Sequence, residues 1–293
     1  MINIYKQISN NKIRSASIIA LFVAFIFATA YLITISFNLD YSLIFLAFIV
    51  SVVTSLVGYY SGDKIVLSLN QARPVTREEF FNFYTIVENL SIANQTPVPK
   101  IYVIDSEAPN AFATGRDPEH AVVCCTIGLL KKLNRTELEA VLAHELSHIK
   151  NYDIRVMTLV SVLVGSLTIL INTATRTSFL RKNNDNNRAG GLITLIGFIL
   201  IIFSPIIAKL IQLAISRRRE YFADASAIKL TRQPQGLIDA LTKISSDSSK
   251  LETASTATSS LYISNPFKNN KLASMFSTHP PIEARIKALQ EML

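Results

Sequence analysis

Residues 144–148 read His-Glu-Leu-Ser-His, and this pentapeptide decides both the fold and the chemistry that we expect. Two histidines four residues apart lie on one face of a helix, so both imidazoles can reach a single metal ion. Zinc accepts imidazole nitrogen at about 2.0–2.1 Å. Glu145 follows the first histidine and can act as the general base toward water. A chance match is the competing interpretation, but the chain has only 4 histidines and two of them stand here.

The surrounding sequence predicts that the motif lies on a capped helix. Asn134 can accept a hydrogen bond at the helix start, and Glu137 three residues later completes a capping-box pattern. Apolar residues then recur at helical spacing between positions 138 and 149. Upstream, Lys100–Asp105 and His120–Ile127 read as short strands. We therefore expect a zincin-like α+β catalytic domain, in which a small sheet accompanies the motif helix.

The third metal ligand must come from elsewhere, because a catalytic zinc usually has three protein ligands and one open position. Within residues 216–224, Glu220 and Asp224 lie four apart and therefore share a helix face. One of them can bind the metal while the other orients a ligand histidine. The competing interpretation is a solvated helix end, in which Arg217–Arg219 are interfacial anchors.

The composition points to a membrane. Apolar residues make up 49% of the chain and charged residues only 17%, which is a low charged fraction for a soluble domain. Four uncharged stretches match the roughly 20 residues that a spanning helix needs; they are 16–37, 41–60, 156–175 and 190–208. The second pair contains Asn172 and Pro205 and can instead be a hydrophobic hairpin packed on the protein. We therefore expect a mainly α membrane protein with two to four transmembrane helices.

The first apolar stretch also has the features of a cleaved signal peptide. Basic residues precede it, and Ala28-Thr29-Ala30 resembles a small-residue cleavage site. The apolar run continues for 7 residues past Ala30, which is longer than a signal needs, so we favour an uncleaved anchor.

Basic residues also orient the chain. Cytoplasmic segments of membrane proteins carry an excess of Lys and Arg, so Lys6, Lys12 and Arg14 place the N-terminus inside and the short loop 38–40 outside. The polar segments then face the cytoplasm. The net charge of +8 has the same explanation, and since no aromatic-interleaved basic motif is present we expect no nucleic-acid partner.

Alternation of apolar and polar segments divides the chain into four expected parts. Residues 1–60 hold two N-terminal transmembrane helices, 61–155 the first part of the catalytic domain, 156–216 a second hydrophobic hairpin, and 217–293 the second part of the catalytic domain. An even number of crossings between His148 and Glu220 returns the chain to the same side of the membrane. A hairpin that does not cross would satisfy this condition too.

Three further segments carry a resemblance to a known family. These are Pro109–Gly115, the run Arg217–Ala225 around the Glu-x-x-x-Asp pair, and Ser277–Pro281 followed by Arg285-Ile286. Together with the His-Glu-x-x-His helix and its flanking apolar pairs, they resemble HtpX-type membrane zinc metallopeptidases, which are more distantly related to the CAAX prenyl proteases. The resemblance covers nearly the whole chain.

This resemblance implies a zinc endopeptidase of the cell membrane, with one zinc ion per chain and its active site in the cytoplasm. Its substrates would be unfolded or damaged membrane proteins, as part of protein quality control under stress. The resemblance implies Glu220 as third ligand, Asp224 as its support, and Asn110 and His279 as cleft residues, with His279 able to stabilise an oxyanion.

Three further expectations concern how such an enzyme works and what else the chain can be. The strand near Ala121–Thr126 is expected to hold an extended substrate by strand addition. A catalytically silent zinc-containing scaffold and a protease specific for prenylated C-termini are the alternatives. The intact Glu145 argues against the scaffold, and the short chain argues against the prenyl protease. The oligomeric state is left open.

Overall fold

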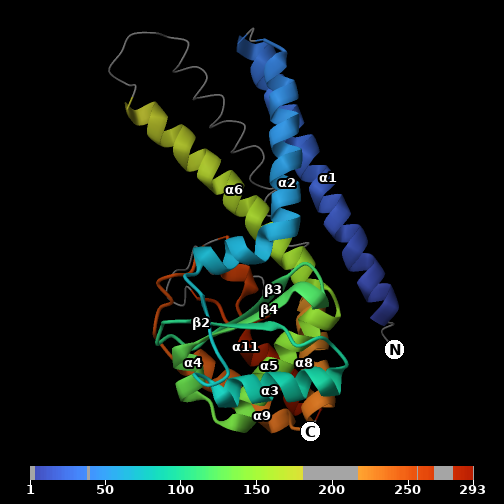
Figure 1. The fold of residues 1–293 in the computed structure, drawn as a ribbon, viewed down its shortest axis with the longest axis vertical. Coiled ribbons are helices and arrows are strands. Elements are labelled where there is room, and N and C mark those ends of the chain that lie inside the picture. Colours follow the sequence, from blue (N-terminus) through green and yellow to red (C-terminus); the bar gives the residue numbers. More distant parts are fainter. Residues whose placement is uncertain (1–3, 38–39, 181–216, 256, 267–279, 293) are drawn as a thin grey trace.

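Two long apolar helices open the chain and stand out from the remainder of the molecule (Figure 1). They are α1 (Ile4–Phe37) and α2 (Ser42–Leu69) in a computed structural model that describes residues 4–37, 40–180, 217–255, 257–266 and 280–292. Both are long and apolar enough to cross a membrane, over Ile8–Leu32 and Ser42–Leu69, with a hydropathy of 2.2 each. The first predicted pair of spans is therefore present.

Helix α6 (Asp153–Leu180) packs against both of these helices. Ile18 and Phe22 of α1 share an apolar cluster with Val160 and Leu163 of α6. This helix contains the third predicted apolar stretch, whereas the fourth, 190–208, lies outside the described residues. The crossing of the second pair therefore stays a prediction, as does the division of the chain into four parts.

Four short strands form a mixed sheet in the order β1-β2-β4-β3. The strands are β1 (Arg73–Pro74), β2 (Lys100–Ile104), β3 (Ala111–Gly115) and β4 (Ala121–Thr126). β2 and β4 are parallel, and β1 and β3 are each antiparallel to their neighbour. The two strands predicted from the sequence are β2 and β4, and both are confirmed.

The prediction that residues 121–126 receive the substrate is wrong. β4 is paired with β2 on one side and with β3 on the other, so it has no edge for strand addition. The edge strands are β3 and the two-residue β1. The sequence did not indicate β3, because Ala-Phe-Ala-Thr-Gly includes residues of weak strand propensity. Strand order depends on long-range pairing that a single strand's composition does not reveal.

The motif helix is α5 (Arg135–Lys150), which lies below the sheet between α3 (Phe81–Asn94) and α9 (Pro234–Ser246) (Figure 1). Its predicted capping box is confirmed: Asn134 Oδ1 accepts from the Glu137 backbone N–H at 3.0 Å, and Glu137 Oε2 accepts from the Asn134 N–H at 2.9 Å. Buried Val141, Leu142 and Leu146 of α5 join the core that continues into the sheet. A cap and an apolar stripe thus hold the motif in place.

The other described elements complete the catalytic half. They are the helices α4 (Ile127–Lys132), α8 (Arg217–Thr231) and α11 (Ile282–Gln290), and the single turns η1 (Pro118–His120) and η2 (Ser259–Leu261). α8 packs along α5, and α11 contacts both α8 and α9. The chain after residue 216 therefore returns to the motif helix, as the even-crossing argument required.

Candidate active site

Three side chains that can bind a metal ion converge between α5 and α8. His144, His148 and Glu220 offer ligand atoms that all lie within 4.8 Å of one another, and all three residues are buried. The two imidazole Nε2 atoms are 3.2 Å apart. Glu220 Oε2 lies 3.6 Å from His144 Nε2, and Glu220 Oε1 lies 3.5 Å from His148 Nε2.

These separations fit a metal ion. Bonds of about 2.0–2.1 Å in a tetrahedral site place ligand atoms roughly 3.3 Å apart, close to the three distances observed. Two imidazole nitrogens and a carboxylate oxygen also form the donor set of a catalytic zinc site. The three side chains are therefore close enough to share one metal ion.

Helix α8 supplies Glu220 because one stripe of this helix is buried against α5. The stripe consists of Arg219, Glu220, Ala223, Asp224 and Ala227. The two alanines allow the helices to approach closely, and the three charged side chains then meet the metal cluster. Of the three predicted interfacial arginines, Arg217 and Arg218 are exposed and only Arg219 turns inward.

Asp224 supports the first histidine. Its Oδ1 lies 2.9 Å from His144 Nδ1, whereas Glu220 faces the other ring nitrogen, Nε2. The buried Arg285 of α11 donates to both Asp224 oxygens, at 2.6 and 2.9 Å, and to the Ile263 carbonyl at 3.3 Å. Glu220 thus faces the cluster and Asp224 stands behind His144, and their roles as ligand and support stay predictions.

Electrostatics in this group follow from the same contacts. Burial disfavours the ionised Asp224, but the charge of Arg285 and hydrogen bonds from His144 and Arg285 outweigh it and lower the pKa of Asp224 to about 2. Burial and Arg285 disfavour the protonated His144, yet hydrogen bonds to Asp224 and Glu220 raise its pKa to about 9. Asp224 is therefore ionised and accepts a hydrogen bond from the His144 ring.

Asp153 supports the second histidine in the same way. Its Oδ2 lies 3.1 Å from His148 Nδ1, and its Oδ1 accepts from Arg219 at 3.1 Å and from Asn11 at 2.8 Å. The chain bends by 83° between α5 and α6, with Tyr152 in the left-handed region at φ 59°. This reversal brings the first residue of α6 back against the last turn of α5.

Glu145 lies buried beside His144 on α5. Burial, with a smaller contribution from the charge of Glu145, raises the pKa of the Cys125 thiol on β4. Glu145 thus stands buried next to the first histidine of the cluster on the same helix. This position is compatible with the predicted base.

Asn110 is buried at the start of β3, where its amide joins two chain segments. Its Nδ2 donates to the Ser264 carbonyl at 2.9 Å, and its Oδ1 accepts from the Ala111 and Ser264 N–H groups at 3.1 and 3.3 Å. Asn110 thus holds the 263–264 segment beside the edge strand, and its role in the cleft stays a prediction. His279 lies outside the described residues.

Three partners of the metal cluster were missed by sequence reasoning: Asp153, Arg285 and Asn11. Asp153 follows His148 by five residues, and an acid just after the motif helix was the available signal. Arg285 was noticed only as part of a C-terminal pattern. Asn11 stands in the polar first part of α1, between Asn10 and Lys12. It lies 142 positions before its partner, and no local pattern connects the two.

Spanning helices joined to a buried cluster of His, His and Glu on a His-Glu-x-x-His helix define a membrane-bound metalloprotease. The sequence model of peptidase family M48 matches residues 81–293 of the chain. The chain belongs to this family and is a metalloendopeptidase.

Relatives similar over their full length agree with this assignment. "Protease HtpX homolog" of Dictyoglomus turgidum is 42% identical, covering 98% of this chain and 94% of the relative. The protein of the same name from Ligilactobacillus salivarius is 41% identical, covering 99% of this chain and 100% of the relative. The chain is thus similar to HtpX-type proteases in sequence, as the motifs predicted.

A solved structure shows the same fold. "Crystal Structure of S. mikatae Ste24p" matches with a TM-score of 0.51 and 23% identity, covering 97% of this chain and 67% of that one. Family and relatives are named as proteases, which favours an enzyme over a silent scaffold. At 23% identity the solved structure supports only the fold. It therefore gives no support to a prenyl-specific protease.

Proposed function

We propose that the metal is zinc and that the protein cleaves unfolded or damaged membrane proteins from the cytoplasmic side of the cell membrane. The observation that carries the proposal is the buried His144–His148–Glu220 cluster, with Glu145 next to its first ligand on the same helix. Two nitrogen donors and one carboxylate oxygen form a set typical of catalytic zinc, with a position left for water or substrate.

When bound, zinc would polarise a peptide carbonyl and lower the pKa of water to about 7. Glu145 then accepts a proton from the attacking water as the new C–O bond forms, and it later delivers this proton to the leaving amine as the C–N bond breaks. Asp224 and Asp153 hold His144 and His148 by their Nδ1 atoms, which leaves both Nε2 atoms directed at the metal.

The edge strand β3 is the proposed binding site for an extended substrate. Thr126 N–H donates to the Asn110 carbonyl at 3.0 Å, so alternation along the ladder turns Ala111, Ala113 and Gly115 toward the outer edge. The Ile263 N–H donates to the Ala111 carbonyl at 3.0 Å, and the Gly115 N–H donates to Thr158 Oγ1 at 3.1 Å. The backbone of Ala113 lies between these contacts. A substrate strand added there would be bound through its main chain more than through its side chains.

Unfolded membrane proteins suit this arrangement as substrates. Helices α1 and α2 hold the catalytic half at a bilayer, where misassembled membrane segments expose extended chain. The cytoplasmic orientation rests on Lys6, Lys12 and Arg14, which precede the first span. His279 is retained in this proposal as a group near the oxyanion.

The proposal is tested with the purified full-length chain in detergent, by measuring zinc content and digestion of casein. We expect one zinc ion per chain, digestion that a chelator abolishes, and recovery when zinc is restored. Glu145→Gln should keep zinc and lose digestion by roughly 10²–10⁴-fold, because only the base is removed. Glu139→Gln, on the same helix and paired with Arg135 at 3.2 Å, is the matched control. Full digestion by Glu145→Gln would contradict the mechanism.

The substrate class is tested separately. A destabilised membrane protein and a prenylated peptide are offered to the same preparation, and cleavage is followed by mass spectrometry. We expect internal cuts in the membrane protein. Cleavage confined to the prenylated C-terminus would instead support the prenyl-specific alternative.

A further inference from the structure

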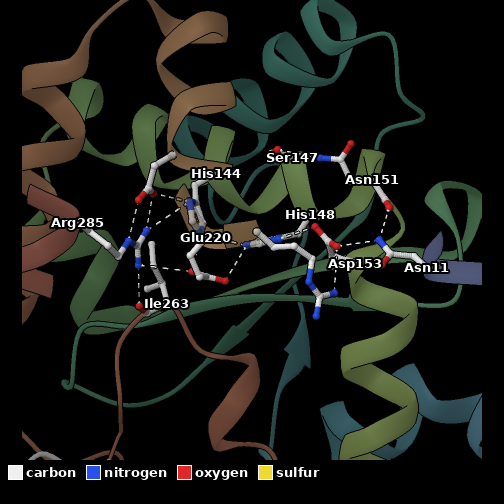
Figure 2. A network of polar contacts seen from close by, with 11 residues as sticks. Asn11, His144, Ser147, His148, Asn151, Asp153, Glu220, Ile263 and Arg285 are labelled. Atoms are coloured by element: carbon white, nitrogen blue, oxygen red, sulfur yellow. Dashed lines mark hydrogen bonds and ion pairs between the residues drawn. The ribbon is translucent and has the colours of Figure 1, made fainter. Parts of the chain in front are cut away.

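One polar side chain of α1, the first membrane helix, contacts a residue that supports the metal cluster. Asn11 of α1 is completely buried, and its Nδ2 donates to Asp153 Oδ1 at 2.8 Å and to the Asn151 carbonyl at 2.9 Å (Figure 2). Both partners are acceptors only, so they determine which end of the amide faces them. The contact is thus specific in orientation as well as in position.

Asp153 links this amide to the metal cluster. One of its oxygens lies 3.1 Å from His148 Nδ1, while the other receives Asn11 and Arg219. A carboxylate held on both oxygens cannot turn freely, and it therefore keeps the imidazole in one orientation. Metal-binding histidines depend on such outer contacts for tautomer and direction.

We propose that Asn11 is a positioning residue of the active site, through which the membrane helix α1 helps to orient His148 for metal binding. The inference rests on the proposed zinc site and adds to it a contribution from the N-terminal anchor. The relay runs from Asn11 to Asp153 to His148, and it joins α1, α6 and α5.

Two hydroxyl groups of α1 behave differently. Ser15 Oγ donates to the Asn11 carbonyl at 2.9 Å, and Thr29 Oγ1 donates to the Phe25 carbonyl at 2.9 Å. Both are contacts within the helix, the common solution for a hydroxyl in an apolar helix. Among the described side-chain hydrogen bonds of α1, those of Asn11 cross to another part of the chain.

Packing explains how α1 can hold this contact in register. Ile18 and Phe22 lie two and three turns beyond Asn11 and pack on α6, the helix that begins with Asp153. One helix pair therefore carries both the apolar contact and the polar one. A change in the packing of α1 against α6 would therefore shift Asp153 and, through it, the orientation of His148.

The test measures zinc affinity of the full-length protein in detergent by competition with a chromophoric chelator. Asn11→Ala should weaken zinc binding about 10-fold, the lower range for loss of an outer contact to a metal ligand. Arg219 still holds Asp153 in this variant, so the loss should stay below that of Asp153→Ala. Ser15→Ala, one turn away on α1 and also buried, should bind zinc as the unaltered chain does.

A double-substitution cycle separates positioning from a general effect on folding. In an Asp153→Ala background, Asn11→Ala should cause less than about a 2-fold further loss of zinc affinity. The carboxylate through which Asn11 orients His148 is already absent there. Thermal unfolding of the metal-free proteins shows whether each variant is folded. Asn11→Asp, which keeps the shape but sets a carboxylate against Asp153, should also bind zinc more weakly and serves if the alanine variant does not fold.

Three results would overturn the inference. The first is that neither Asn11 variant changes the zinc affinity. The second is that Asn11→Ala lowers the zinc affinity equally with and without Asp153. The third is that Ser15→Ala lowers the zinc affinity as much as Asn11→Ala does. Absence of zinc binding by the unaltered chain would overturn the proposed metal site itself, and with it this inference. The two failures are thereby distinguishable.

Discussion

Glu220 and Asp224 are the same kind of group on the same helix, and their surroundings separate their roles. Glu220 faces the Nε2 atoms of both histidines, whereas Asp224 lies behind His144 and is held by Arg285. Arg285 also lies 3.7 Å from Glu220 Oε2, but its two short hydrogen bonds go to Asp224, whose charge it therefore neutralises more strongly. This difference supports Glu220 as the third ligand.

The first prediction at this scale is that Glu220→Ala loses zinc. Removing one of three protein ligands leaves two imidazoles, which do not complete a catalytic site. We expect a preparation without bound zinc after dialysis, measured by atomic absorption. Glu283→Ala, an exposed acid on α11, should retain one zinc ion per chain. Normal zinc content in Glu220→Ala would reassign the third ligand.

The second prediction concerns Arg285, which is completely buried against Asp224. Arg285→Met fills similar space but leaves the Asp224 carboxylate buried without its guanidinium, at a cost of about 3–5 kcal/mol. We expect a clear fall in the unfolding temperature of the metal-free protein, measured by differential scanning fluorimetry. Lys287→Met, an exposed position on the same helix, should change it little. Equal unfolding temperatures would show that the ion pair contributes no stability.

At the scale of elements, a pair of glycines on α2 sets the distance to α6. A Cβ on Gly62 would lie 2.8 Å from Thr158 Cγ2, and one on Gly58 would lie 3.2 Å from Val162 Cγ1. Small residues four apart are a common device for close helix packing in membranes. Thr158 cannot turn away easily, because its hydroxyl contacts Thr114 Oγ1 at 2.8 Å and Gly115 N–H at 3.1 Å.

We therefore predict opposite effects for two identical changes. Gly165→Ala on α6 meets only ordinary contact, 3.4 Å from Ala257 Cβ, and should raise stability by up to about 1 kcal/mol through helix propensity. Gly62→Ala gains the same propensity but pushes α2 from α6, and should lower stability by about 1–3 kcal/mol. Unfolding in detergent measures both. A stabilised Gly62→Ala would show that the helices separate without cost.

At the scale of the whole molecule, the open question is the path between α6 and α8. The metal cluster requires both helices on one side, which either a crossing pair or a surface hairpin satisfies. We predict that the pair crosses, so that the loop between its members faces outward. A cysteine at position 185 should then react with a membrane-impermeant maleimide added to intact cells. The native Cys124 and Cys125 are buried and give little background. Labelling only after cell lysis would favour the hairpin.

Much of the fold was predictable from local patterns. The spans of α1 and α2 follow from uninterrupted apolar runs, and the motif helix follows from the capping pair Asn134 and Glu137. β2 and β4 were recognisable by composition. The start of α3 at Phe81 was less recognisable, because local periodicity defines helix ends poorly.

The sequence by itself determined the pair His144 and His148, because four residues along a helix return to the same face. It also reduced the third ligand to Glu220 or Asp224 by the same geometry. Only the tertiary structure showed that Glu220 is the carboxylate facing the cluster, as the family resemblance implied, and that β3 is an edge strand. It also brought Asp153, Arg285 and Asn11 behind the ligands. The contacts of Arg285 with Asp224 and of Asn11 with Asp153 join residues 61 and 142 positions apart, and such pairings arise from the packing of whole helices rather than from any local repeat.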